Sequence, residues 1–335
     1  MPTVLDVAKR AGVAPITVSR VINNSGYISQ ATRERVEAAV KELGYVPNTL
    51  ARGLRSKQTR TLALVVTDIT NPYFTLMARG VEDVAGSSNY SVVYCNTDES
   101  EAKEEKYANL LAQRQVDGAL LVPSGGNVKT INFLLSNGIV VVALDRCVPG
   151  MEVDSVRCDS QDGAYRLIKL LISLGHKRIA TITGPKDVST SIDRVTGYQR
   201  ALREAGLIEN ELVYYGAFKQ QSGYEFTKQA ILLSPRPTAI FGANNFITIG
   251  IIQALHDLML DVPGDVSVVG FDDLPEAMLM NPFLTVAKQP AYEMGRVAAE
   301  LLLKRISGEQ VGECQELILP TEIIERGSIG PNRAS

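Results

Sequence analysis

Short apolar runs alternate with amphipathic helical stretches over most of this chain, from about residue 61 onward. Continuous apolar strands separated by helices are typical of parallel sheets that are covered on both faces. Because about 270 residues are many for one core, and because the cycle starts again after Asp159, we predict two doubly wound α/β lobes. The apolar runs lie at 62–66, 92–94, 119–122, 140–144, 179–182, 239–241 and 266–270.

The first sixty residues differ from the rest in charge. They hold ten Lys or Arg and four Asp or Glu, whereas the remaining residues hold 24 and 33, so a head of formal charge +6 precedes a body of −9. A mildly acidic chain with a basic head suggests that the head meets a polyanion and that the body does not.

Local signals predict two short helices at the start of this head. Thr3 can cap the first helix, with Asp6 three residues on as a short version of the capping box, and Gly12 ends it. The second helix begins at Pro15, whose missing N–H costs nothing in a first turn, and breaks at Asn23.

A third helix completes an all-α, helix-turn-helix head. It is capped by Ser29 and ends before Gly44, and its apolar stripe consists of Val36, Ala39, Val40 and Leu43. Two short helices around a Gly-containing turn, closed by a third, form the helix-turn-helix pattern.

The polar face of the second helix indicates what the head binds. Val18, Val21 and Ile22 should pack inward, and Ile16, Thr17, Ser19, Arg20 and Asn23 should project. Arg suits guanine O6 and N7 in the major groove, and Thr and Ser suit phosphates or base edges. The alternative is a small packed domain with a solvated basic surface. The projecting residues favour DNA.

Four segments carry a family resemblance: LDVAKRAGV at 5–13, TVSRVIN at 17–23, LGYVPN at 43–48, and Ala51 and Arg52 with Leu54. In this order and spacing they resemble the lac repressor (LacI/GalR) family of bacterial transcription regulators, and the likeness continues to the C-terminus. The resemblance implies a helix-turn-helix DNA-binding domain over 1–46 and a hinge helix and linker over 47–60.

The resemblance also implies an effector-binding and dimerisation domain over 61–330. Its two parallel-sheet lobes are expected to be of the periplasmic-binding-protein-like type. The N-lobe would span about 61–158 plus 290–319, and the C-lobe about 159–289 plus 320–330. In such proteins a ligand closes the lobes at the cleft between them.

The family's DNA contacts fall on named positions of this chain. Pro15, Ile16 and Arg20 match residues that read major-groove bases, and Leu54 matches a wedge that inserts into the minor groove and bends the duplex. Residues that match phosphate-contacting, supporting or hinge positions are Thr3, Thr17, Ser19, Asn23, Ser29, Thr32, Tyr45, Asn48, Ala51 and Arg52.

Two positions in the head depart from the family. Ala14 stands where a capping Ser is usual, which removes a side-chain cap commonly worth ~1 kcal/mol. Gly53 replaces another Ser and makes a hinge helix less favourable by roughly 0.5–1 kcal/mol. We expect a looser hinge and weaker operator binding than in a typical relative.

Candidate ligand residues follow the ends of the predicted strands, where α/β proteins bind their ligands. Arg146 ends the fourth run and could grip hydroxyls or a carboxylate with both guanidinium arms. Together with the positions that match the family's effector contacts, the candidate effector-binding residues are Asn71, Tyr73, Phe74, Arg146, Thr190, Arg194, Phe218, Asn244, Asp272 and Gln289.

These side chains indicate a sugar-type pocket, with an acidic sugar, a sugar phosphate, a polyol or a nucleobase as open alternatives. The family usually has Asn-Asp at the end of a strand, before Ala-x-Gly, whereas this chain has Asn244-Asn245 at the end of the strand before Gly250. The change removes one fixed negative charge and puts the usual role of that position in doubt. Phe246 adds apolar surface near the mouth.

An enzyme and an exported binding protein are the rival classes. The chain has two histidines, His176 and His256, and none of the nucleophile-elbow, phosphate-loop, dinucleotide or H-E-x-x-H motifs. We expect no catalytic residue, no metal and no cofactor besides a small-molecule effector. His176 precedes a predicted strand and is interpreted as structural.

The start of the chain lacks an export signal, and no stretch is long and apolar enough to span a membrane. The four scattered cysteines have no zinc or C-x-x-C spacing and are expected to be reduced and mostly buried. Both observations predict a cytoplasmic protein.

The sequence therefore predicts a transcriptional regulator, most simply a repressor, that binds a palindromic operator as a homodimer. A sugar-like effector between the lobes would control operator affinity. The alternatives are control by a non-sugar ligand or a protein co-effector and, more remotely, a solute-binding protein without a DNA role. No heptad repeat follows Arg326, so we expect no tetramer built from the tail, and the acidic stretch 99–115 is predicted to be a solvated helix face.

Overall fold

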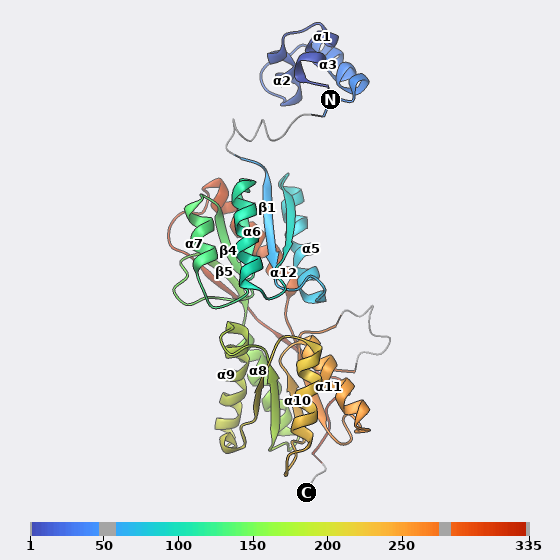
Figure 1. The fold of residues 1–335 in the computed structure, drawn as a ribbon, viewed down its shortest axis with the longest axis vertical. Coiled ribbons are helices and arrows are strands. Elements are labelled where there is room, and N and C mark those ends of the chain that lie inside the picture. Colours follow the sequence, from blue (N-terminus) through green and yellow to red (C-terminus); the bar gives the residue numbers. More distant parts are fainter. Residues whose placement is uncertain (1, 47–57, 275–282, 333–335) are drawn as a thin grey trace. The chain divides into compact units, whose positions relative to one another are not determined.

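The computed structural model describes residues 2–46, 58–274 and 283–332. The chain divides into two compact units, Met1–Thr59 and Arg60–Ser335, which we describe separately (Figure 1). Asn48, Ala51, Arg52, Gly53 and Leu54 lie outside the described residues, so the predictions made for the hinge stay predictions.

The described part of the first unit folds as helices α1 (Val4–Ala11), α2 (Pro15–Ile22) and α3 (Gln30–Leu43). Thr3 and Asp6 form the complete capping box predicted for α1, since the Thr3 hydroxyl accepts from the Asp6 N–H and Asp6 accepts from the Thr3 N–H at 2.8 Å. Gly12 ends the helix in the left-handed conformation, with φ 64°.

The N-terminal caps of α2 and α3 differ in how well they agree with the prediction. Pro15 occupies the first turn of α2 and Ala14 leaves that helix without a side-chain cap, as predicted. Ser29 stands at the N-cap of α3, but its hydroxyl pairs with the Thr32 hydroxyl at 2.9 Å and makes no bond to the helix backbone. The prediction that the Ser29 side chain caps α3 is therefore wrong.

The head encloses a small core of its own. Val7, Val18 and Val36, one from each helix, are completely buried, and partly buried Val40 and Leu43 pack against them. Because α2 buries Val18 and Val21, its opposite side faces outward, as the sequence predicts.

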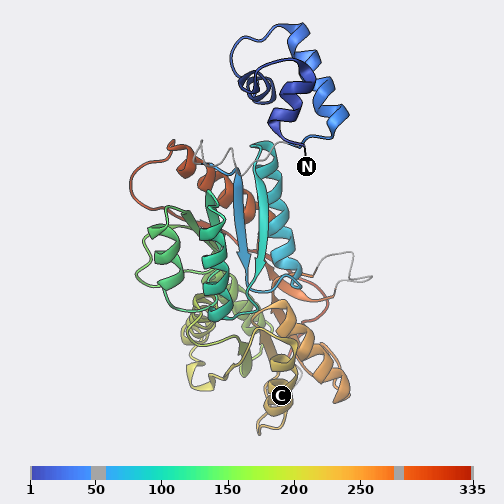
Figure 2. The same ribbon diagram turned by 45° about the horizontal axis from the view of Figure 1, so that its top comes forward.

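The second unit contains two sheets of six described strands each, both flanked by helices (Figures 1 and 2). The first sheet has the order β11-β5-β4-β3-β1-β2 and every pair in it is parallel. Its strands are β1 (Thr61–Val66), β2 (Ser91–Asn96), β3 (Gly118–Leu121), β4 (Val140–Leu144), β5 (Asp154–Cys158) and β11 (Glu316–Leu319).

Helices cover both faces of this first sheet, which we call the N-lobe sheet. One core joins it to α5 (Pro72–Ser87) and α12 (Ala291–Ser307). A second core, on the other face, joins it to α6 (Glu101–Gln113) and α7 (Lys129–Ser136). Burial on both faces explains why its central strands are continuously apolar.

The second sheet, the C-lobe sheet, has the order β12-β10-β9-β8-β6-β7. It is parallel except for the antiparallel pair β10–β12. Its strands are β6 (Ile179–Thr183), β7 (Val213–Tyr215), β8 (Ala239–Gly242), β9 (Ser267–Phe271), β10 (Thr285–Lys288) and β12 (Glu322–Ile324).

Helices α8 (Ser160–Ser173) and α9 (Ser189–Glu204) cover one face of the C-lobe sheet. Helices α10 (Gln220–Ile231) and α11 (Asn245–Asp257) cover the other, and the short 3-10 helix η1 (Ile208–Asn210) follows α9. Within the described residues the chain passes from one sheet to the other after β5, after β10 and after β11. The predicted fold class, an all-α head followed in sequence by two doubly wound lobes, is confirmed.

Every apolar run of the prediction forms a strand, but several strands carry weaker signals. The run at 92–94 belongs to β2, an edge strand, where Val93 and Tyr94 remain 36% and 42% exposed. The prediction lacked β5, β7, β10, β11 and β12, which are short or include charged residues.

In the described part of the chain, no helix combines the length and the apolar character that a membrane crossing requires.

Cys95 and Cys158 are buried, Cys147 is half-buried and Cys314 is exposed, so the expectation of mostly buried thiols holds for two of the four. The acidic stretch 99–115 is also less uniform than predicted: α6 begins at Glu101, and the carboxylate of Glu104 is buried and accepts from the Ser124 N–H at 2.6 Å.

Helices α10 and α11 pack through two glycines. A Cβ on Gly250 would lie 2.0 Å from the Gln220 carbonyl oxygen, and a Cβ on Gly223 would lie 2.0 Å from the Ile247 carbonyl oxygen. The absence of side chains lets the two backbones meet, which fixes the position of α11.

Gly250→Ala should destabilise the second unit by about 1–3 kcal/mol, because the new methyl group meets backbone that cannot move aside. Gly86→Ala, in α5, is the matched control. A Cβ there meets nothing within 4 Å, so the alanine should stabilise its helix by roughly 0.5–1 kcal/mol. Thermal unfolding followed by circular dichroism measures both. A Gly250→Ala protein that unfolds at or above the wild-type temperature would contradict the packing.

Candidate functional site

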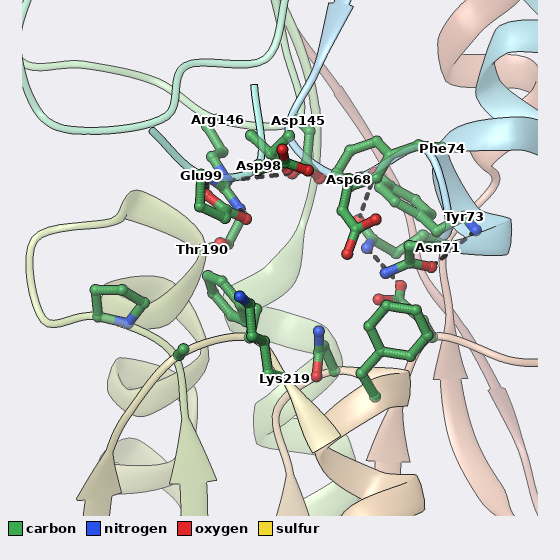
Figure 3. A pocket seen from close by; sticks show the side chains of 18 of the residues that line it. Asp68, Asn71, Tyr73, Phe74, Asp98, Glu99, Asp145, Arg146, Thr190 and Lys219 are labelled. Atoms are coloured by element: carbon green, nitrogen blue, oxygen red, sulfur yellow. Dashed lines mark hydrogen bonds and ion pairs between the residues drawn. The ribbon is translucent and has the colours of Figure 1, made fainter. Parts of the chain in front are cut away.

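A cavity of about 560 Å³ lies between the two lobes, where the carboxyl ends of both sheets meet (Figure 3). The residues that follow β1, β2 and β4 line it from the N-lobe, and those that follow β8 and β9 line it from the C-lobe. All ten effector residues of the prediction are among its lining: Asn71, Tyr73, Phe74, Arg146, Thr190, Arg194, Phe218, Asn244, Asp272 and Gln289.

The lining also contains residues outside the ten assigned to effector binding. They are Thr67, Asp68, Asp98, Glu99, Asp145, Pro185, Ala217, Lys219 and Phe246. Asp68 and Asp145 lie within two residues of the ends of strands β1 and β4, so the strand-end rule that selected Arg146 points to them as well. Glu99 and Lys219 lie in connections that carry no such signal.

Arg146 is buried and its guanidinium is already engaged by a carboxylate. Its Nη1 and Nη2 donate to the two oxygens of Glu99 at 2.6 and 2.7 Å, and Nη1 also donates to the Pro123 carbonyl. Burial lowers the pKa of Arg146, but the hydrogen bonds and charge of Glu99 raise it above its usual value. The guanidinium group that was predicted to bind a ligand with both arms therefore binds Glu99 instead (Figure 3).

Arg194 enters the cleft from α9 and lies over the Phe271 ring, 3.9 Å from its centre. Its Nη1 donates to the Ala243 carbonyl at 2.6 Å. Asp272, which follows Phe271 in the sequence, accepts a hydrogen bond from the Gln289 side-chain amide at 2.6 Å. Burial raises the pKa of the Asp272 carboxyl to about 6, although Arg194 opposes the rise.

Aromatic rings form the apolar part of the lining. Tyr73 and Phe74 pack edge to face with their centres 5.1 Å apart. The buried Tyr73 hydroxyl donates to Asp145 at 2.7 Å, and burial together with the Asp145 charge raises the pKa of Tyr73 well above its usual value. Phe218, from the opposite lobe, faces the Arg146 guanidinium at 5.2 Å.

Asn245, the residue that departs from the family pattern, links the two lobes. Its Nδ2 donates to Asn71 Oδ1 at 2.8 Å, and Asn71 Nδ2 donates to Asn245 Oδ1 at 3.1 Å. A carboxylate at position 245 could accept one of these hydrogen bonds but could not donate the other. The neighbouring Asn244 caps α11 by accepting from the Ile247 N–H at 2.8 Å.

Four acidic residues of the lining adopt left-handed backbone conformations. The φ angles of Asp98, Glu99, Asp145 and Asp272 are 52°, 58°, 65° and 69°. Such conformations cost of order 1–3 kcal/mol for residues other than glycine and persist where surrounding structure enforces them. Their concentration around one cavity is typical of a binding site.

A second candidate site is the outward side of α2. Ile16 is 52% exposed, Pro15, Arg20 and Asn23 are exposed, and the Asn23 amide donates to the Ser19 carbonyl at 2.7 Å. The other predicted DNA-contacting residues in the described head are either exposed, as are Thr3 and Ser29, or half-buried, as are Thr17, Ser19, Thr32 and Tyr45. No nearby acidic group within the described head is ion-paired with Arg20.

Of the histidines, His176 is buried. Its ring nitrogens lie 2.9 Å from the Thr238 hydroxyl and 3.0 Å from the Gly330 carbonyl, and burial lowers its pKa. It thus ties the C-terminal segment to the C-lobe, which confirms its structural interpretation. His256 is exposed at the end of α11.

A helix-turn-helix head and a two-lobed body with a polar, aromatic-lined cleft define the class of ligand-responsive DNA-binding regulators. Comparison with known proteins identifies the family. Residues 3–48 match the model of the lacI family of bacterial regulatory proteins, and residues 168–329 match that of the periplasmic binding protein-like domain.

Relatives resemble the chain over nearly its whole length. It is 37% identical to the ribose operon repressor of Escherichia coli over 330 residues, which cover 98% of this chain and all of the relative. A solved complex of the transcriptional regulator CelR with cellobiose is 36% identical, with a TM-score of 0.74 and coverage of 98% and 100%. The lac repressor dimer bound to operator and an anti-inducer is 29% identical, with a TM-score of 0.85 and coverage of 98% of both chains.

The chain therefore belongs to the lacI family of bacterial regulatory proteins. It is a DNA-binding transcriptional regulator that responds to a small-molecule effector, and its relatives are regulators and not enzymes. The family resemblance found in the sequence is confirmed.

Asp272→Asn should stabilise the ligand-free protein above pH 6. Because the pKa of Asp272 rises from its usual 3.8 to about 6, the folded chain holds this proton at a pH where the unfolded chain has released it. The free energy of unfolding of the wild-type protein should therefore fall by roughly 3 kcal/mol as the pH rises from about 4 to about 6. Asparagine avoids the loss and still accepts from Gln289.

Free energies of unfolding of both proteins between pH 4 and pH 8 measure this effect. The matched control is Asp273→Asn, which removes the partner of Arg326, 2.7 Å away, and should destabilise the protein. A stability difference between wild type and Asp272→Asn that stays constant from pH 4 to pH 8 would show that Asp272 does not carry this cost.

Proposed function

We propose that the protein is a repressor that binds a near-palindromic operator as a homodimer, and that a sugar-type ligand in the cleft controls its affinity for that operator. The observation that carries the proposal is the convergence of the ten predicted effector residues on one cavity, in a chain that begins with a helix-turn-helix head. The proposed domains are 1–46 for DNA binding, 47–60 for the hinge and linker, and 61–330 for effector binding and dimerisation.

The outward residues of α2 support the operator part of this proposal. Arg20 would donate to guanine O6 and N7, Ile16 would contact a thymine methyl group, and Pro15 would lie beside them in the major groove. Phosphate contacts would come from the polar residues around them. Leu54, outside the described residues, is proposed as the minor-groove wedge of each subunit.

Two such heads would read the two halves of a palindrome, which requires a two-fold dimer. The lac repressor of the solved operator complex is a dimer, and we propose the same arrangement here. We also propose that the protein acts in the cytoplasm, where it has access to DNA and where its four cysteines stay reduced.

The composition of the cleft supports a sugar-type effector. Aromatic rings can cover the C–H faces of a sugar ring, while carboxylates and amides bind its hydroxyls. The CelR relative was solved with cellobiose. Ligand bound to Arg194 in the C-lobe and to Asp145 in the N-lobe would hold the lobes together and alter the spacing of the two hinges.

Arg20→Ala should weaken operator binding by about 1–3 kcal/mol, or roughly 5–150-fold, and relax the base preference at the position that it reads. The matched control is Arg10→Ala. Arg10 lies on α1, outside α2, and forms an ion pair with Glu42 at 2.7 Å. Binding to a library of palindromic sites, measured by selection and gel shift at fixed salt, gives both results. An equal loss of operator affinity in the two variants would show that Arg20 contributes only nonspecific positive charge and does not read a base.

A further inference from the structure

We propose that the cleft selects uncharged, polyhydroxylated ligands and rejects carboxylated and phosphorylated ones, and that Glu99 sets this preference by occupying Arg146. The inference rests on the proposed effector site and narrows its ligand class. Its basis is the balance and pairing of charges around the cavity.

Negative charge is in excess among the described lining residues. Five carboxylates, Asp68, Asp98, Glu99, Asp145 and Asp272, stand against the three cations Arg146, Arg194 and Lys219. Lys103, outside the lining, pairs with Asp98 and neutralises one of the five. An anionic ligand would therefore enter a cavity that already carries surplus negative charge, where burial strengthens the repulsion.

The two buried arginines already have carboxylates beside them. Glu99 takes both arms of Arg146. Arg194 lies close enough to Asp272 to lower the pKa of that carboxyl against the effect of burial. Lys219 is exposed at the edge of the cleft, where water screens its charge. A ligand carboxylate would have to displace Glu99 to obtain a two-armed contact with Arg146.

The guanidinium N–H groups that stay unpaired in the described part of the chain are single donors, which suit a hydroxyl oxygen better than a carboxylate. The Nε atoms of Arg146 and Arg194 are buried and have no hydrogen-bond partner among the described residues. Each is a single N–H, whereas a carboxylate is bound best by two parallel N–H groups. Asp145 can accept a hydrogen bond from a ligand O–H, because within the described residues its carboxylate accepts only from the Tyr73 hydroxyl at 2.7 Å and lies 3.7 Å from Arg146 Nε.

The backbone holds Glu99 in this place. The turn after β2 puts Asp98 and Glu99 into successive left-handed conformations, and the Glu99 N–H donates to the Thr67 carbonyl at 3.3 Å. Figure 3 shows the Glu99 carboxylate facing Arg146 from the wall of the cavity. This ion pair of buried Arg146 with half-buried Glu99 is a fixed part of the site and excludes the carboxylate of a ligand from the same position.

The test compares neutral and anionic versions of the same sugars by thermal unfolding and calorimetry of the full chain. The pairs are glucose and glucuronate, galactose and galacturonate, and ribose and ribose 5-phosphate, with cellobiose and sorbitol as further neutral probes. At least one neutral probe should bind, and the anionic partner of any bound sugar should bind at least tenfold more weakly. Arg194→Ala should abolish binding, which locates it in the cleft.

Glu99→Gln tests the residue itself. It frees Arg146 from a competing charge, so the ratio of neutral to anionic affinity should fall at least fivefold. Glu105→Gln, an exposed glutamate on α6 outside the lining, is the matched control and should leave the ratio unchanged.

Three results would overturn the inference. An anionic sugar that binds as tightly as its neutral partner, with binding lost in Arg194→Ala, would refute charge selection and leave the proposed effector site intact. An unchanged ratio in Glu99→Gln would refute the role of Glu99. Absence of binding by every neutral probe would refute the neutral ligand class, and absence of binding by the anionic sugars as well would also refute the sugar-type effector.

Discussion

Parallel pairing of strands in both sheets is the constraint on which the cleft depends. Parallel strands end at the same edge, so the residues that follow β1, β4, β8 and β9 converge although they are far apart in sequence. The chain passes between the sheets after β5, β10 and β11, which turns those edges toward one another. Charged and strained residues can gather at this edge because the apolar strands behind them supply the stability.

The cleft is held together by polar contacts that burial makes strong. The amides of Asn71 and Asn245 join the lobes by two hydrogen bonds, and Phe218 of one lobe faces Arg146 of the other. Such contacts favour a closed arrangement, and a ligand that adds contacts to both lobes would favour it further. The energy that separates the closed and open arrangements is what the protein can use to change its affinity for DNA.

Much of this architecture could be predicted from local signals. The capping box at Thr3, the glycine that ends α1 and the buried stripe of α3 follow from neighbouring residues. The strand-end rule and the family resemblance pointed to the residues that line the cavity. The pairing of Ser29 with Thr32 and the short strands such as β12 depend on tertiary contacts, which a linear pattern does not contain.

The partner of Arg146 is the clearest case of what the sequence alone does not reveal. Glu99 lies 47 residues away and begins an acidic stretch that reads as a solvated helix face. Only the fold places its carboxylate against a buried guanidinium. In the same way, the sequence shows Asn245 only as the loss of a carboxylate that the family usually has. The fold shows that its amide forms one half of the hydrogen-bonded link between the lobes.

We propose that ligand binding in the cleft and operator binding by the head are coupled. The direct measurement is the operator affinity with and without a sugar that binds the cleft, together with the affinity for that sugar with and without operator. Linkage requires the two factors to be equal, and we predict a value of about 5–150-fold. A sugar that binds the cleft and leaves the operator affinity unchanged would contradict the account.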